Sequence, residues 1–344
     1  GSVEPVTHAL TSLLLARAGQ KHLPRFGTAM LIISGTAADL DYLSYFGGAS
    51  VFLRFHRAVL HSLLGSAFVA FIVAAIFYLL DRNRLQSASA STPAALRFLP
   101  AFVVCAAGAA AHALLDVASG IGVRLLWPFG HGWIAGDFLT NLDPWILVIL
   151  VLGIFLPELV RLVSEEIGER KKGPGGQGAA VTAILFFLLY LCARADLHSR
   201  AIDLLNSREY HGTPPLAVGA FPTSLSPFRW RGVISTDNTI QEAEISLGPG
   251  PQFDPDRTTT HYKPQASAAL DAAQKTQTAK RLLAYARFPL ATLEQSDSGY
   301  RVSMRDIRFA PNDASPDNII AIVRLDPSLR VISQQLLYAS SSSH

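Results

Sequence analysis

Apolar residues are concentrated in six segments within the first 195 residues, separated by short polar connections. Three of these segments approach the roughly 20 residues that a membrane-spanning helix needs, once their flanks are included. The last segment is borderline, and the first two are short enough to be tilted, buried or re-entrant. The pattern predicts a helical transmembrane domain of about five to six helices, from segments 6–18, 27–38, 60–80, 98–115, 144–162 and 179–193.

The composition changes near residue 195, and this change marks the predicted domain boundary. Leu, Ala, Val, Ile and Phe dominate before it, whereas Pro, Ser, Thr, Asp and Arg occur in ordinary soluble proportions after it. Only 16% of all residues are charged, compared with about a quarter in a typical soluble domain. We therefore predict a membrane domain over 3–195 and a soluble domain over 196–344.

The soluble domain has mixed secondary-structure signals, which predict an α+β fold. Alternating apolar positions indicate strands, and residues 264–288 have the periodicity of one helix of about 20 residues. Residues 212–232 have the composition of a Pro-rich loop. The predicted strands are 241–248, 300–310, 318–326 and 330–339.

The net charge of +3 does not indicate nucleic-acid binding, because the basic residues form short clusters between apolar segments and not one stripe. Such clusters typically flank membrane helices on the cytoplasmic side. This rule assigns the connections 81–97 and 161–178 to the cytoplasm, and the chain then alternates across the membrane without contradiction. The soluble domain is therefore predicted to be extracytoplasmic.

Ionisable residues interrupt the apolar half at several points, and the predicted topology brings them to one membrane depth. Individually each has an ordinary explanation, since Asp caps helices and an i, i+4 pair such as His112 and Asp116 often shares a hydrogen bond. Four separate segments, however, deliver them to the outer side of the membrane, and ionisable groups at such depths usually mark function. These residues are His8, Asp39, Asp41, His56, His61, His112 and Asp116.

Imidazoles and carboxylates without thiolates suit divalent metals, with Zn preferred and Mn or Fe as alternatives. Seven ligands are too many for one four-coordinate ion, and they suffice for two ions joined by a carboxylate bridge from the Asp39-Leu40-Asp41 sequence. Arg57 has two interpretations of equal weight. It is either an interfacial anchor that reaches the headgroups or a clamp for a phosphate or carboxylate.

Four motifs carry a resemblance to a known family: "THALTS", "GTAADLDYL", "HRAVLHSLLG" and "HALLDVASGIGVRLLWPF". In order and content, over about residues 4–130, they resemble the membrane-bound, metal-dependent hydrolases that include a LexA-regulated bacterial inner-membrane protein. The resemblance implies a multi-pass protein of the bacterial inner membrane with the seven ligands named above. Ala38, Ala58 and Leu60 depart from the family pattern, which puts the tuning of the metal in doubt, and not its binding.

Together these observations predict a metal-dependent hydrolase at the outer face of the membrane, in which two metal ions activate water. The expected substrate is a phosphoester of a lipid or lipid-linked compound, and the expected catalytic residues are Asp41, Asp116 and Arg57. A lipid amide or ester hydrolase with the same metal site is an alternative. A metal transporter or sensor is a further alternative, although residues 64–80 and 98–111 carry no charged side chain toward the inner face. The sequence does not define the oligomeric state.

Overall fold

The computed structural model describes residues 4–86, 95–130, 132–140, 142–166, 176–210, 212–223, 225–249, 253, 258–310, 313 and 315–339. Both basic connections assigned to the cytoplasm lie partly outside these residues. The packing of the chain defines two units. The first unit comprises residues 2–41 and 57–195, and the second comprises residues 42–56 and 196–344.

Among the described residues, four helices of the first unit are long and apolar enough to cross a membrane. Between 22% and 33% of each candidate span is buried, so most of its apolar surface is available to lipid. The four helices are α4 (Leu63–Gln86), α5 (Phe98–Ala118), α6 (Pro144–Glu166) and α7 (Gln177–Asn206), the last of which continues into the second unit.

The expectation of five to six spanning helices is not confirmed. Helices α1 (Glu4–Gly19) and α2 (Gly27–Ser34) have 16 and 8 residues. At a rise of about 1.5 Å per residue they reach only about 24 and 12 Å, short of the roughly 30 Å hydrocarbon core. A 3-10 helix, η1 (Ala37–Gly47), follows α2.

Two apolar clusters hold the helices of the first unit together. In one, Met30 of α2 packs with Val73 of α4 and Cys105 of α5. In the other, Leu14 of α1 packs with Leu150 of α6, and residues of α7 complete the cluster. Helix α1 also packs against α5 and α6, and α2 packs against α4 and α5. Each of the two short helices therefore packs against two of the long ones.

Gly108 allows α5 to approach α2 very closely. A Cβ at this position would lie 2.4 Å from Ser34 Oγ and 2.7 Å from the carbonyl oxygen of Leu31. Small residues at helix contacts are a common device for close packing in membranes. One turn after this contact, the same face of α5 carries His112, which is thereby brought against the end of α2.

The second unit is built mainly from two antiparallel four-stranded sheets, each with its strands in sequential order. Phe221 and Val233 of one sheet share an apolar core with Leu290 of the other. The first sheet is β1 (Ala217–Pro222), β2 (Arg229–Ser235), β3 (Thr239–Ser246) and β4 (Thr259–Tyr262), and the second is β5 (Pro289–Ser296), β6 (Gly299–Asp306), β7 (Ile319–Leu325) and β8 (Val331–Tyr338).

The single helix predicted over 264–288 is wrong. Two short helices stand there, α8 (Ala268–Gln274) and α9 (Gln277–Leu283). Thr276 separates them, because its hydroxyl accepts a hydrogen bond from the Ala279 N–H and caps α9. The predicted loop 212–232 contains β1 and the start of β2, which the Pro content concealed.

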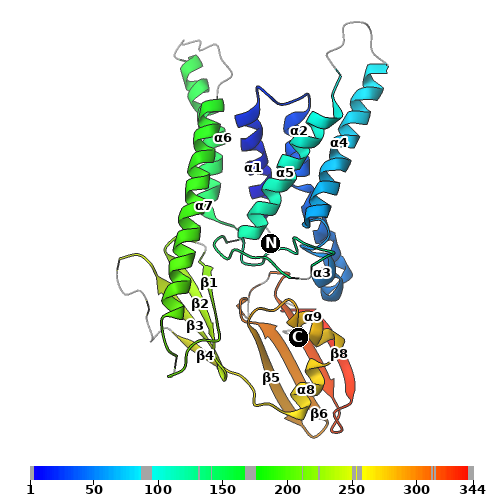
Figure 1. The fold of residues 1–344 in the computed structure, drawn as a ribbon, viewed down its shortest axis with the longest axis vertical. Helices are drawn as coiled ribbons and strands as arrows, with labels where there is room; N and C mark the ends of the chain where they lie inside the picture. The colour runs from blue at the N-terminus through cyan, green and yellow to red at the C-terminus, as the bar shows by residue number, and fades with distance from the viewer. Residues whose placement is uncertain are drawn as a thin grey trace. The chain divides into compact units, whose positions relative to one another are not determined.

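Residues 42–56 come from the apolar half of the sequence and nevertheless pack with the second unit. They contain the end of η1 and helix α3 (Ala49–Phe55), which lies against β8 (Figure 1). The rings of Tyr45 and Tyr338 stack at 4.6 Å, and the Tyr338 hydroxyl donates a hydrogen bond to the backbone carbonyl of Tyr45. The predicted division into 3–195 and 196–344 placed this segment in the membrane domain. In the structure, aromatic contacts with β8 group it with the second unit.

Candidate metal centre

Six of the seven predicted ligands lie in the first unit, on four separate elements. All of them are buried or nearly so. The i, i+4 spacing places two of them on one face of α5, and the short loop after α2 brings in two more from η1. The six are His8 of α1, Asp39 and Asp41 of η1, His61 of the turn before α4, and His112 and Asp116 of α5.

Three of these residues direct their ligand atoms to one point. Nε2 of His61 lies 3.0 Å from Nε2 of His112. Oδ2 of Asp116 lies 2.9 Å from the first nitrogen and 3.3 Å from the second. A tetrahedral zinc ion with ligands about 2.0–2.1 Å away would hold those ligands about 3.3 Å apart. The three atoms therefore fit one face of a small metal's coordination shell.

A hydrogen bond orients the ring of His112, and a close carboxylate orients the ring of His61. Nδ1 of His112 lies 2.9 Å from the carbonyl oxygen of Gly35, which has no proton, so Nδ1 must donate. The lone pair of neutral His112 is then on Nε2. Nδ1 of His61 lies 3.0 Å from Oδ2 of Asp41, an arrangement that likewise directs Nε2 toward a metal. Asp41 thus lies behind a ligand in this geometry.

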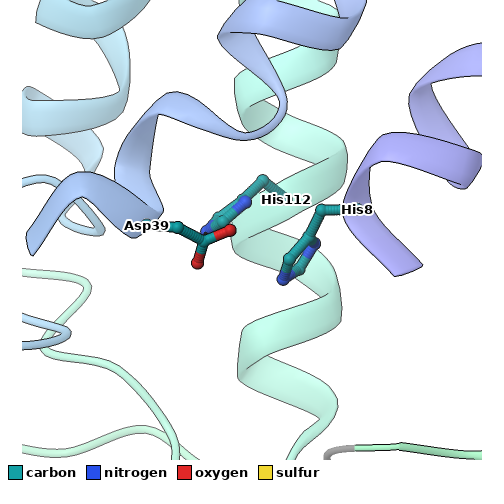
Figure 2. A group of neighbouring side chains, drawn as sticks. All are labelled: His8, Asp39 and His112. Atoms are coloured by element: carbon teal, nitrogen blue, oxygen red, sulfur yellow. The ribbon is translucent and has the colours of Figure 1, made fainter. Parts of the chain in front are cut away.

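A second group joins His8, Asp39 and His112, whose ligand atoms lie within 4.8 Å of one another (Figure 2). The rings of His8 and His112 are stacked at 3.8 Å. Nδ1 of His8 and Oδ2 of Asp39 are buried and make no hydrogen bond with any described residue. Buried polar atoms without partners are costly, so both atoms suit a cation.

The two groups share His112, whose Nε2 has one lone pair and can serve only one ion. A second ion would therefore depend on His8, Asp39 and the other oxygen of Asp116. Oδ1 of Asp116 is 3.4 Å from Nε2 of His8, while Oδ2 faces His61 and His112. The geometry makes Asp116 a better bridging carboxylate than the Asp39–Asp41 pair that the sequence suggested.

Arg57 is buried, with 1% of its surface exposed, which is not the position of an interfacial anchor. Its guanidinium donates to Ser119 Oγ at 3.1 Å and lies 3.5 Å from Oδ1 of Asp116. Its backbone has a φ of 54°, which is uncommon for a residue other than glycine. The Arg57 N–H donates to Oδ2 of Asp41 at 2.6 Å, and this bond stabilises the turn that leads to His61.

The buried charges of the cluster do not balance by themselves. Three carboxylates and one guanidinium leave an excess of two negative charges when the histidines are neutral, and buried charge is costly unless paired. Burial lowers the pKa of His61, but hydrogen bonds with Asp116 and Asp41 outweigh it and raise that pKa to about 10. Burial also raises the pKa of Asp39, which His112 and His8 oppose. Two protons, or one divalent cation, would neutralise this excess.

His56 is the one predicted ligand that belongs to the second unit. Its ring stacks on Phe52 at 4.2 Å and contacts Tyr42 at 4.5 Å. Its Nε2 lies 3.7 Å from Oδ1 of Asp317. His56 is therefore not among the residues that the first unit brings together, and its role as a ligand stays a prediction.

A cavity of about 30 Å³ adjoins His8 and Asp116. Thr7 and Thr140 also line it, and their hydroxyl oxygens are buried without a hydrogen-bond partner among the described residues. A water needs about 10–15 Å³ of such volume and two or more polar partners, so the cavity has room for water beside Asp116.

Sequence reasoning missed several residues that support the site. Gly35 and Ser119 lie within the quoted motifs, but the roles of the Gly35 carbonyl and the Ser119 hydroxyl depend on long-range contacts that the motifs do not reveal. Thr7 had a signal, since it directly precedes His8 in the "THALTS" motif.

Comparison with known proteins now identifies the family. The family model described as YdjM inner membrane protein matches residues 3–200, more than half of the chain. The chain belongs to the YdjM inner membrane protein family. This confirms the inner-membrane family and its contact with a bilayer, as predicted from the motifs. Comparisons with curated proteins and with solved structures found no match.

The region that matches the YdjM family contains all seven predicted ligands and all four candidate spans, apart from the last turns of α7. The two sheets of the second unit lie beyond it. Hydrolase activity and metal dependence are not part of the family description and stay predictions.

Proposed function

We propose that this protein is an integral-membrane, metal-dependent hydrolase that cleaves a phosphoester of a lipid or lipid-linked substrate. The observation that carries the proposal is the convergence of His61 Nε2, His112 Nε2 and Asp116 Oδ2, with separations of 2.9–3.3 Å. Bound divalent metal, zinc above all, would polarise the substrate's oxygens and increase the acidity of water.

The protein's own groups hold the donors in place. Gly35 orients the ring of His112, and Asp41 orients the ring of His61. Arg57 fixes Oδ1 of Asp116 and offsets part of the negative charge. We therefore assign Arg57 and Asp41 to positioning, which differs from the catalytic roles that the sequence suggested for them.

With a single ion held through Oδ2 of Asp116, its Oδ1 is the better candidate for the general base. Asp116 lines the cavity that has room for water, whereas Oδ2 of Asp41 is already occupied by the Arg57 N–H and faces His61. A general base must lie within hydrogen-bonding reach of the proton that it accepts. Thr7 and Thr140, on the other walls of the cavity, would hold the water against this carboxylate.

The helices support a lipid substrate and an outward-facing site. Along both α4 and α5, the site lies at one end and the arginines at the other. His61 precedes α4 and His112 is in the second half of α5, whereas Arg84 is in the last turn of α4 and Arg97 precedes α5. Since basic residues favour the cytoplasmic side, the site would face the outer leaflet. An extracytoplasmic second unit follows from the same orientation.

The test is metal analysis of purified protein combined with mass spectrometry of inner-membrane lipids incubated with it. We expect bound zinc or manganese and the appearance of a phosphorylated headgroup, or of its lipid partner, that chelation abolishes and added metal restores. His61→Ala should lose both metal and activity while remaining folded. His22→Ala is the matched control, because His22 is exposed and outside the site.

Other outcomes would redirect the proposal. Release of a fatty acid or amine without a phosphorylated product would favour an ester or amide hydrolase with the same site. Metal flux into proteoliposomes without lipid turnover would favour a transporter. A protein that turns over lipid equally well with and without His61 would remove the metal centre from the mechanism.

A further inference from the structure

The segment 42–56 of the second unit has two faces of opposite character. One face is buried: Phe52, Leu53 and His56 are each at most 6% exposed. The other presents four apolar side chains, which we call the apolar patch: Leu43, Phe46, Val51 and Phe55, exposed by 65%, 85%, 37% and 41%. Leu43 and Phe46 share a face of the 3-10 helix through their i, i+3 spacing, and Val51 and Phe55 share a face of α3 through their i, i+4 spacing. Exposed apolar surface of this extent usually marks an interaction site.

The buried face is attached firmly to the second unit, so the apolar patch has a defined orientation. Tyr45 stacks on Tyr338 of β8. The Arg281 guanidinium of α9 donates to Ser50 Oγ at 2.7 Å. Rearrangement of the segment to bury the patch would break these contacts.

We propose that the apolar patch inserts into the headgroup region of the bilayer and anchors the second unit to the membrane surface. The segment is too short to span, and Gly48 interrupts it between η1 and α3. Short segments with an apolar face and a cationic residue typically lie in the plane of the interface.

Charge and chain length favour lipid as the occupant. Residues 42–56 contain no acidic residue, and Arg54, which is exposed, stacks over the ring of Phe55 at 5.3 Å. An arginine beside apolar side chains suits the phosphates of anionic lipids. Phe55 is eight residues before Leu63, the first residue of the candidate span α4. Because eight residues reach at most about 28 Å, the chain itself keeps Phe55 near the membrane.

A second copy of the chain is a poorer fit for the apolar patch. From their exposed fractions, the four side chains offer roughly 400 Å², about half of the 800 Å² per partner that a stable protein interface buries. This inference does not depend on the proposed function, because it concerns residues outside the metal centre.

Nitroxide spin labels test the proposal in the full-length protein. Leu43→Cys, Phe46→Cys and Val51→Cys would be labelled in a Cys192→Ala background, since Cys105 is buried. The protein would be placed in vesicles of phosphatidylethanolamine and phosphatidylglycerol. Collision rates with oxygen and with a water-soluble nickel chelate then report the surroundings. Leu79→Cys on α4 is the lipid control, and Tyr262→Cys on β4 is the water control.

We expect the ratio of oxygen to nickel collisions at the patch to exceed that at Tyr262→Cys several-fold and to approach that at Leu79→Cys. Nickel access equal to the water control would overturn the proposal, and so would low access to both reagents, which indicates cover by protein. If the labelled variants fail to fold, Phe46→Trp replaces them. Its added emission should be quenched by lipids brominated on the acyl chain, and unquenched emission would refute the anchor.

Discussion

The sequence suggested Asp41 as a metal ligand, whereas in the structure Asp41 lies behind the predicted ligand His61. Its Oδ2 lies 3.0 Å from Nδ1 of His61 and accepts the Arg57 N–H at 2.6 Å. Asp41→Asn keeps the size of the side chain and an oxygen that can accept both bonds, but it removes the negative charge. Losing such a partner behind a metal ligand typically lowers metal affinity about 10–100-fold, or about 1.4–2.8 kcal/mol.

The assay is a zinc titration of the purified protein against a chromophoric chelator, with metal content measured in parallel. Asp41→Asn should bind zinc about 10–100-fold more weakly and still bind it, whereas His61→Ala should bind none at the centre. Asp81→Asn is a matched control, because Asp81 is equally buried and also accepts a backbone N–H, from Leu96 at 2.8 Å. Its zinc affinity should equal that of the unmodified protein.

Three results would refute this reasoning. Complete loss of zinc in Asp41→Asn, as in His61→Ala, would show that Asp41 is itself a ligand. Unchanged affinity would show that its charge does not act on His61. A fall in affinity in Asp81→Asn as well would assign the effect to general destabilisation of the first unit.

Three further predictions concern stability and pH. Arg57→Gln should lower the free energy of unfolding by about 3–5 kcal/mol, because it leaves a buried carboxylate without its cation; denaturant titration in detergent would show no change if the pair were unimportant. Gly108→Val should lower the free energy of unfolding by about 1–3 kcal/mol through overpacking, and it should also weaken zinc binding. Gly153→Ala is the control: its new Cβ would lie 2.4 Å from the Cβ of Ala183 in α7, so it should lower stability without affecting zinc binding. Zinc affinity should rise with pH from 6 toward the pKa of His61, about 10, because the metal displaces that proton; calorimetry in buffers of different ionisation enthalpy would reveal proton release, and its absence would contradict the prediction.

Much of the candidate site follows from the sequence because its strongest signals are local. The i, i+4 spacing of His112 and Asp116 places both on one face of a helix. The alternation of apolar segments across the membrane then predicts that the starts of α1 and η1 and the end of α5 lie on one side. The four long helices follow from their apolar length for the same reason. In the first unit, predictions that needed only residue spacing or apolar length were therefore the most informative.

The errors have local causes of another kind. A helix over 264–288 was expected because its periodicity continues through Thr276, yet a hydroxyl that bonds to Ala279 ends one helix and begins the next. The strand β1 was concealed by the prolines around it. At Thr276 a single side chain decides the backbone, and around β1 the prolines outweigh the alternation of the strand. A pattern averaged over a window registers neither.

The roles of the ionisable residues depend on backbone turns and distant partners that no spacing reveals. His56 and His61 are five residues apart, yet the left-handed conformation of Arg57 lies between them, and the two rings belong to different units. The Arg57 N–H, released from any helix by that turn, bonds to Asp41, which in turn orients His61. The same turn therefore separates one predicted ligand from the cluster and positions another within it. It follows that the residue types predict a metal centre, whereas the division into ligands and positioning residues that we propose depends on the conformation of Arg57.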